Sequence, residues 1–252
     1  MKKVLVIGDV CEDVYIYGKS SRLAPEAPVP VFVPCHEKRN GGMAKNVYNN
    51  LVSLGINCDI IHNVKEIQKI RYVDEKTNHI FIRVDTNESD IDRVKDYLID
   101  KEFLSQYDAV VISDYNKGFL SEEDIEKICY HHPLTFMDTK KKLGRWCKEC
   151  TWIKINEEEY HETCNNIMEL EHIFDDKLVV TLSENGCRYK KKTYPVEKVE
   201  IKDLSGAGDT FLAAFVAEYM SSQNVEKSII FANECATQVV QLKGVNIVKK
   251  RT

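Results

Sequence analysis

The sequence of 252 residues lacks any apolar segment long enough to cross a membrane, and it has no excess of positive charge. Its formal net charge is −5, whereas a general nucleic-acid binder needs a basic surface. The apolar run after the first lysines is too short for a secretion signal, so we expect a cytoplasmic protein with neither membrane nor nucleic acid as a partner. A content of 43% hydrophobic and 30% charged residues is typical of a globular protein in water.

The sequence also lacks the cysteine pattern of a disulfide framework or a zinc site. Its nine cysteines are odd in number and scattered, and without a secretion signal we expect them to be reduced thiols. The CxxC pair, Cys147 and Cys150, has no second pair, and His131, His132 and His161 have no regular ligand spacing. A metal site at this pair is the less favoured alternative.

Two phosphate-binding motifs are missing as well. The sequence has no GxxxxGK[ST], which excludes a P-loop, and GAGDTF lacks the third glycine of a dinucleotide fingerprint. What it does contain is DLSGAGDTFLAAF at residues 203–215, in which Gly206, Ala207 and Gly208 open an apolar segment of helical period. Asp209 would lie in the first turn of this helix, where the positive end of the helix dipole favours a carboxylate.

This segment has two interpretations. In one, Asp209 caps the helix and the glycines form a tight turn, which is common at helix starts. In the other, the backbone amides of residues 206–208 bind a phosphate, because glycines leave the backbone accessible, and Asp209 accepts a proton from an attacking hydroxyl.

Short apolar segments alternate with helical ones along most of the chain. Buried strands are expected at KVLVIG, DAVVISD, LTFMD, WIKIN and KLVVTL, hairpins at RYVDEKTNHIFIRVD and CRYKKKTYPVEKVEI, and helices near residues 43–55, 89–99, 121–132 and 225–242 and after Gly206. The alternation predicts an α/β fold with a mostly parallel central sheet flanked by helices. Segments near residues 12–38 and 69–85 do not fit it, so we expect one domain over residues 1–252 with a small β lid.

Polar residues recur where the expected strands end. They are Asp9, Asp13, Asp114, Lys117, Asp138, Lys140, Asn156, Glu159 and Thr181. Ligands of open α/β sheets bind beyond the carboxyl ends of the strands, so this shared placement favours a site. Each residue singly is also explained as a cap or turn residue.

Several segments of the sequence resemble those of a known family. DLSGAGDTFLAAF resembles the C-terminal signature of the ribokinase-like (PfkB) carbohydrate kinases, commonly written DTxGAGD. The further segments SRLAPEAPVP, GGMAKNV, FIRVD, VISDYNKGFLS and INEEEY resemble, within that family, the kinase domain that acts on D-glycero-D-manno-heptose 7-phosphate. The resemblance implies a ribokinase-like fold and an ATP-dependent sugar kinase that uses ATP and Mg²⁺.

The resemblance also implies roles at matching positions. It makes Asp209 the catalytic base and residues Gly206, Ala207 and Gly208 an anion hole. It places sugar-hydroxyl contacts at Asp13, Gly41, Gly42 and Asn46, nucleotide contacts at Thr181, Gly186 and Asn233, and water-mediated magnesium support at Asn156 and Glu159. Candidates to hold a sugar phosphate are Arg22, Arg71, Arg83 and Lys117, which are equally explained as surface charges of the lid.

The sequence departs from the family pattern in three places. Leu204 and Ser205 replace the usual threonine pair, and the spacing from Gly41 to Asn46 is more like that of ribokinase. Between residues 62 and 69 a helix and strands of the family are missing. Two alternatives therefore stay open, namely a non-catalytic nucleotide or sugar sensor on a shortened kinase scaffold, and a kinase for a nucleoside or a simple pentose or hexose.

The last expectation from the sequence concerns assembly. APEAPVPVFV alternates apolar residues with prolines, as an exposed lid strand would. Small β layers gain stability by pairing with a copy of themselves, and relatives of this family tend to dimerise through their lids. We therefore expect a homodimer with Val29, Val31 and Val33 near the interface, although each valine could instead cover the sheet of its own subunit.

Overall fold

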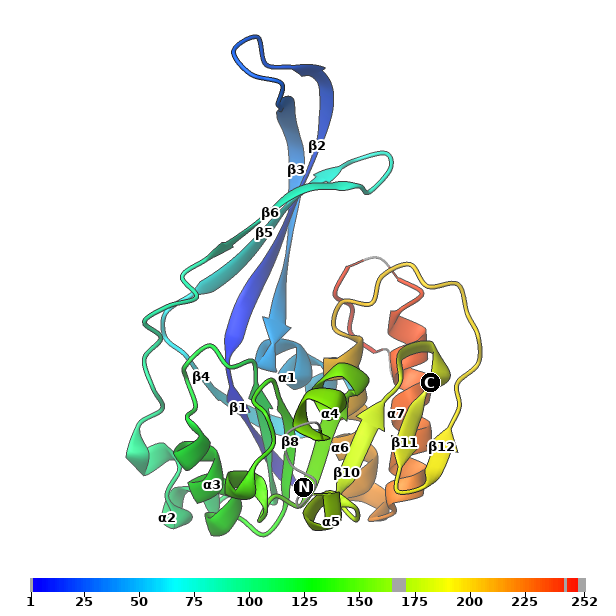
Figure 1. The fold of residues 1–252 in the computed structure, drawn as a ribbon. Helices are drawn as coiled ribbons and strands as arrows, with labels where there is room; N and C mark the ends of the chain where they lie inside the picture. Colours follow the sequence, from blue (N-terminus) through cyan, green and yellow to red (C-terminus); the bar gives the residue numbers. More distant parts are fainter. Residues whose placement is uncertain (1, 165–170, 243, 249–252) are drawn as a thin grey trace.

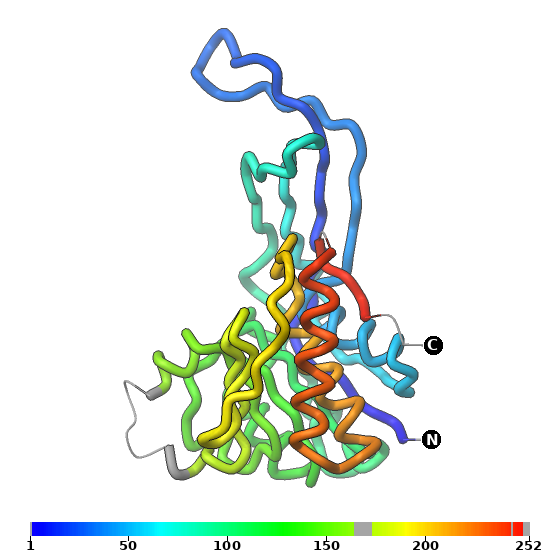
Figure 2. Tube along the Cα trace, turned by 90° about the vertical axis from the view of Figure 1, so that its right-hand side faces the viewer, coloured from blue at the N-terminus to red at the C-terminus, as the bar shows by residue number. Residues whose placement is uncertain are grey.

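The chain forms an α/β body with a second, smaller sheet that projects from it (Figure 1). The structure is a computed structural model that describes residues 2–164, 171–242 and 244–248. In a view turned by 90°, the projecting sheet still extends away from the body as a narrow layer, and the chain of its first hairpin reaches farthest (Figure 2).

The body is built on an eight-stranded sheet in the order β12-β11-β10-β9-β8-β7-β1-β4. Its parallel strands are β1 (Lys3–Gly8), β4 (Asn57–His62), β7 (Ala109–Asp114), β8 (Thr135–Thr139), β9 (Trp152–Asn156) and β10 (Leu178–Thr181), and the antiparallel strands β11 (Cys187–Tyr189) and β12 (Lys192–Tyr194) complete it. All parallel strands end at the same edge, so the residues that follow them meet there.

Helices cover both faces of this sheet, because successive residues of its buried strands point to opposite sides. One face carries α1 (Ala44–Ser53), α6 (Ala207–Ser222) and α7 (Val225–Val239). The other carries α2 (Lys101–Leu104), α3 (Glu122–His131), α4 (Glu157–Cys164) and α5 (Glu171–Phe174), with the short 3₁₀ helices η1 (Asp96–Leu98) and η2 (Arg145–Cys147), while η3 (Ser183–Asn185) follows β10.

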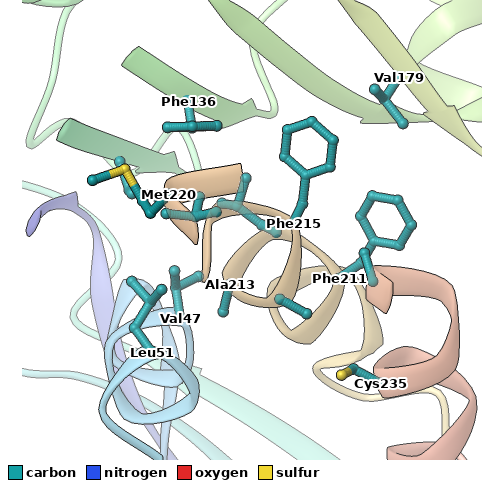
Figure 3. Close-up of a cluster of buried hydrophobic side chains, with 14 of the residues drawn as sticks. Val47, Leu51, Phe136, Val179, Phe211, Ala213, Phe215, Met220 and Cys235 are labelled. Carbon is teal, nitrogen blue, oxygen red and sulfur yellow. The ribbon is translucent and has the colours of Figure 1, made fainter. Parts of the chain in front are cut away.

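Helix α6 is apolar on all sides because it is buried between α1, α7 and the sheet. Figure 3 shows Phe211 and Phe215 of this helix among side chains of the sheet and of the neighbouring helices. The ring of Phe215 meets that of Phe136 on β8 edge to face, with centroids 5.9 Å apart. This packing fixes the position of the first turn of α6.

The projecting sheet has the order β3-β2-β5-β6 and is formed by β2 (Val10–Leu23), β3 (Pro30–Met43), β5 (Ile67–Asp74) and β6 (Ile80–Thr86). Cross-strand partners show that its two faces differ. One face carries Asp13, Tyr15, Lys69, Arg71, Arg83 and Asp85, and the opposite face carries Val14, Ile16, Ile70, Tyr72, Ile82 and Val84. We call this sheet the lid.

The fold confirms the α/β class, the mostly parallel sheet and the small β lid expected from the sequence. The expected hairpin at residues 71–85 is formed by β5 and β6. The prediction of a helix near residues 89–99 was wrong. The Val94 N–H donates to the carbonyl of Phe119, and only the short η1 forms in this segment. The second hairpin is shorter than expected, since β12 ends before Pro195, which has no N–H to continue a ladder.

Neither a disulfide nor a membrane helix occurs in the part of the chain that the structure describes. The eight cysteines whose side chains are described are free thiols, and none of the described helices is both long and apolar enough to cross a bilayer. Around Cys147 and Cys150, as elsewhere in the described residues, no group of three His, Cys, Asp or Glu side chains is arranged to hold a metal ion.

Candidate active site

A buried carboxylate lies at the start of α6, at the edge where the parallel strands end. Gly206 has the left-handed backbone angle φ 79°, which glycine adopts without strain, and it turns the chain into the helix. Asp209 follows in the first turn and is almost fully buried. A side chain at position 206 would also collide with Asn46, because an added Cβ would lie 2.5 Å from its Nδ2.

Both oxygens of Asp209 accept a hydrogen bond from a neutral side chain. The Tyr115 hydroxyl donates to Oδ1 at 2.7 Å, and Asn46 Nδ2 donates to Oδ2 at 3.1 Å. The pKa of Asp209 is raised to about 6, chiefly by burial and also by Asp138, while the two hydrogen bonds and Lys154 oppose the rise. A carboxylate with a pKa near 6 is ionised at neutral pH and is still basic enough to accept a proton.

A cavity of about 500 Å³ opens beside this helix start. The residues expected to contact a nucleotide, Thr181, Gly186 and Asn233, lie in its wall, and so do the expected anion-hole residues Gly206, Ala207 and Gly208. Its far wall is formed mainly by residues 196–201 and by α7. The cavity thus runs from the end of β10 to the amides at the start of α6.

A buried ion pair that the sequence analysis did not single out lies at the same helix start. Lys154 Nζ contacts Asp138 Oδ2 at 2.7 Å, and both side chains are less than a tenth exposed. A Cβ added to Gly208 would lie 2.8 Å from this ammonium group, so the lysine rests directly against the glycine backbone. Asp138 Oδ1 is buried without a hydrogen-bond partner, and both residues line the cavity.

Asn156 and Glu159 form a reciprocal pair at the start of α4. Glu159 N–H donates to Asn156 Oδ1 at 2.8 Å, and Asn156 N–H donates to Glu159 Oε2 at 2.8 Å. Lys140 forms an ion pair with the other carboxylate oxygen of Glu159. Asn156 and Lys140 line the cavity, whereas Glu159 lies behind them.

The lid brings the residues expected to contact a sugar close to the base. Arg71 donates to Asp13 Oδ1 at 2.6 Å, and both groups are largely buried. Glycine is required at position 42, because an added Cβ would lie 2.2 Å from Asp13 Oδ2. A Cβ added to Gly41 would likewise collide with the Lys45 side chain. Asp13 and its glycine neighbour therefore form a tightly packed corner where the lid joins the body.

Two of the expected substrate contacts have partners within the chain. The Asn46 amide group donates to both Asp209 and the carbonyl of Gly206, so it holds the base in place. The Lys117 ammonium pairs with Glu88 at 2.7 Å. Lys117 also contributes its backbone N–H to Asp9 at 3.2 Å, which fixes the loop after β7.

The other cations considered for a sugar phosphate are not equivalent. Arg83 is paired with Asp85. Arg22 is exposed and is the penultimate residue of β2, and the end of the β2–β3 hairpin lies far from α6 (Figure 1). Lys69, which the sequence analysis did not consider, pairs with no carboxylate in the described residues and lies 5.6 Å from the centre of the Tyr115 ring. Of the lid cations, Lys69 is therefore best placed to meet an anion near the base.

The sequence held a signal for the three residues that were missed. Lys154 is a charged residue inside the apolar strand WIKIN, and Tyr115 lies within SDYNKG, a segment that no secondary-structure preference explains. Lys69 and Arg71 are two positions apart on β5, so their side chains lie on the same face of the sheet. Their meeting with Asp209 depends on tertiary packing, which these local patterns do not specify.

Comparisons with known proteins agree with this geometry. The family model described as "pfkB family carbohydrate kinase" matches residues 57–251. The chain is similar to the bifunctional protein HldE of Helicobacter pylori (strain HPAG1), at 31% identity over 297 aligned positions that cover 97% of this chain and 64% of that protein. HldE of Nitratiruptor sp. is 29% identical, with coverage of 96% and 62%. The chain therefore spans about two thirds of the length of these relatives.

Solved structures share the fold at low identity. A ribokinase from Thermotoga maritima superposes with a TM-score of 0.73 at 16% identity, covering 97% of this chain and 95% of that one. An Arabidopsis thaliana ribokinase complexed with ribose and ATP gives a TM-score of 0.68 at 13% identity, covering 96% and 94%. With the family model matching most of its length and an acid at the start of α6, the chain belongs to the pfkB family of carbohydrate kinases, which are phosphotransferases.

Proposed function

We propose that the protein transfers the γ-phosphoryl group of ATP to a hydroxyl of a sugar phosphate, with D-glycero-D-manno-heptose 7-phosphate as the favoured substrate. The observation that carries the proposal is Asp209, a buried carboxylate with a pKa near 6 in the first turn of α6, next to Gly208 and Tyr115 of the cavity wall. A cap residue would need neither this burial nor the two side-chain donors that hold it.

The cavity suits ATP in shape and charge. A volume of about 500 Å³ is typical of a cofactor-sized site. Its walls near Ile201, Phe211 and Val240 are apolar, as the adenine ring requires, and the start of α6 lines it together with Lys154 and Lys140. In this arrangement the triphosphate points toward the helix start and Asp209.

The reaction follows from this placement as a direct in-line transfer. Asp209 accepts the proton of the sugar hydroxyl as the oxygen attacks the γ-phosphorus, and the bond to the β-γ bridging oxygen breaks. The amides of residues 206–208 and the ammonium of Lys154 stabilise the charge on the transferred group. No group of the protein is covalently modified, and the proton leaves from Asp209 after product release.

The residues near Asn156 fit a magnesium ion that is held chiefly by water and phosphate. The carboxylate of Glu159 and the amide oxygen of Asn156 each accept one backbone hydrogen bond. Their remaining lone pairs suit the water molecules around a magnesium ion better than direct coordination of the ion. The ion would neutralise charge on the β- and γ-phosphates when bound. Glu159 also orients Lys140 toward the cavity.

Two observations support a phosphorylated sugar as acceptor. Lys69, on the lid face toward the body, is a cation without a carboxylate partner in the described chain, and Arg71 on the same face is only singly paired with Asp13. The segments SRLAPEAPVP and SDYNKG resemble the heptose kinases in particular. A phosphate on the sugar would therefore be held by the lid while the reacting hydroxyl meets Asp209.

We also propose that two copies associate through their lids. The lid face opposite the site carries apolar side chains, and Ile82 is 55% exposed there. On the β2–β3 hairpin, Val29 and Val33 are 51% and 57% exposed, and Val31 is half-buried. An exposed sheet face of this kind is covered when it pairs with a second copy.

The experiment that tests the function measures ATP consumption with a panel of sugars and sugar phosphates. We expect heptose 7-phosphate to give the highest kcat/KM, and Asp209→Asn to lower kcat by about a hundredfold or more while ATP binding is kept. A preference for a pentose, hexose or nucleoside would refute the substrate assignment. Absence of turnover with every acceptor would refute the kinase and favour a sensor.

A further inference from the structure

Tyr115 lies at the meeting point of three parts of the molecule. It is the first residue after β7, and its backbone N–H donates to Asp9 Oδ2 at 2.8 Å. Asp9 also accepts from the backbone N–H groups of Lys117 and Phe119, and Asn116 and Gly118 adopt positive φ angles. The loop is therefore held in one conformation, which directs the tyrosine side chain to a defined place.

The Tyr115 side chain lies against Asp209. The Tyr115 hydroxyl donates to Asp209 Oδ1 at 2.7 Å, and two lysines lie near the ring, with Lys69 Nζ 5.6 Å and Lys140 Nζ 5.5 Å from its centre. Lys69 belongs to the lid and Lys140 to the body. A side chain that only filled space would not need its hydroxyl aimed at a carboxylate.

We propose that Tyr115 is a positioning residue that orients Asp209 and keeps it ionised as the base of the phosphoryl transfer, an assignment that rests on the proposed function. With one donor on each oxygen, from Tyr115 and Asn46, the carboxylate cannot rotate without losing a hydrogen bond. The remaining lone pair of each oxygen is free for the proton of the acceptor hydroxyl.

The electrostatics agree with this role. The ionisable groups that face Asp209 are Cys11 from β2, Tyr115 from the loop after β7, Asp138 and Lys140 from the end of β8, and Lys154 from β9. Burial and Asp138 raise the pKa of Asp209, and the hydrogen bond from Tyr115 lowers it. Burial and Asp209 hold the pKa of Tyr115 well above 10, so the phenol stays protonated and donates throughout the working pH range.

Tyr115→Phe tests the proposal because it keeps the ring and removes the donor. Loss of a hydrogen bond to a carboxylate should raise the pKa of Asp209 by about one to two units. The base acts only when ionised, so the acidic limb of kcat/KM, expected near pH 6, should move to higher pH by that amount. The deficit in rate should then be about five- to fiftyfold at pH 6 and smaller above pH 8.

A matched control is available on the far side of the sheet. The Tyr107 hydroxyl donates to Asp59 Oδ2 at 2.9 Å, before β7 begins, so Tyr107→Phe removes a tyrosine–aspartate hydrogen bond away from the site, at a carboxylate that is half exposed and also paired with Lys3. We expect it to leave the pH profile unchanged. As a second variant at position 115, 3-fluorotyrosine keeps the hydroxyl and makes it a stronger donor, and should move the acidic limb to lower pH.

A readout independent of turnover separates this proposal from the proposed function. ¹³C NMR of labelled aspartate carboxyls, with the Asp209 signal assigned from Asp209→Asn, gives the pKa of Asp209 in the parent and in Tyr115→Phe. A rise in that pKa supports the positioning role even if no tested sugar is phosphorylated. An unchanged pKa, or a rate lowered equally at every pH, would overturn it.

Discussion

Replacement of Lys154 tests whether the buried ion pair at the start of α6 acts in catalysis or only in folding. Lys154→Met removes the ammonium that lies against Gly208 and beside Asp209. Removal of one group that stabilises transition-state charge lowers kcat by about 10²–10³-fold. Because that charge develops as the phosphoryl group transfers, we expect kcat to fall much more than ATP affinity.

The same change has a cost in stability that has to be separated from the cost in rate. Asp138 and Lys154 are both less than a tenth exposed, and removal of one partner of such a pair costs about 3–5 kcal/mol. The double variant Lys154→Met/Asp138→Asn leaves no unpaired charge. We expect it to recover most of the lost stability in denaturant unfolding, and to stay about as slow as Lys154→Met.

A second ion pair serves as the control. Lys141 contacts Asp114 at 2.8 Å with comparable burial, but Lys141 does not line the cavity. Lys141→Met should destabilise the fold to a similar degree and reduce kcat by only a few-fold. The reasoning fails if the Lys154→Met/Asp138→Asn protein is folded and turns over at a rate near that of the parent.

Two further predictions concern the metal and the assembly. Glu159→Gln should raise the magnesium concentration needed for half-maximal rate, because it weakens a charged hydrogen-bond acceptor for metal-bound water; an unchanged magnesium dependence would limit Glu159 to holding Lys140. Light scattering at micromolar concentration should show a dimer, and Val33→Asp or Ile82→Asp should shift it to monomer with the fold intact, because both side chains are already more than half exposed. A monomeric parent protein, with or without nucleotide, would refute the lid interface.

The elements of the fold could be predicted because their signals are local. The buried strands β1, β7 and β8 are continuous apolar segments, and α3 begins at Ser121 with the capping box that its sequence suggests. The segment at residues 89–99 has charge but no tertiary support for a helix, and its backbone bonds elsewhere. Local preference therefore decided the strands, whereas tertiary contacts decided this segment.

The site could be predicted only in outline. Asp209 and residues 206–208 were identifiable, because a glycine-rich helix start with an acid is visible in thirteen consecutive residues. Its hydrogen bond with Tyr115 joins residues 94 positions apart, and the Lys154–Asp138 pair joins two different strands. Such contacts depend on the order of strands in the sheet and on side-chain packing, neither of which is encoded in a short pattern.

The connection between β4 and β5 is short, and it lies where the family resemblance predicts a missing segment. The alignment with HldE of Helicobacter pylori extends over 297 positions, more than the 252 residues of this chain, so the relative has residues that this chain lacks. Asn63 holds the connection: its side chain bonds to both the N–H and the carbonyl of Val10, at 2.7 and 3.1 Å, and to the carbonyl of Lys65. The chain thus passes from the body into the lid within four residues.

The position of this shortening determines what it can affect. β4 is the edge strand of the body, whereas the residues around Asp209 come from the interior strands β7, β8 and β9 or the loops after them, and from α1 and α6. β5 still pairs with β2 over eight consecutive residues, which keeps Lys69 and Arg71 beside Asp13. A segment missing at this edge would therefore leave Asp209, the start of α6 and the charged lid face in place. For this reason we expect the short connection to alter the edge of the sugar pocket and not to abolish phosphoryl transfer.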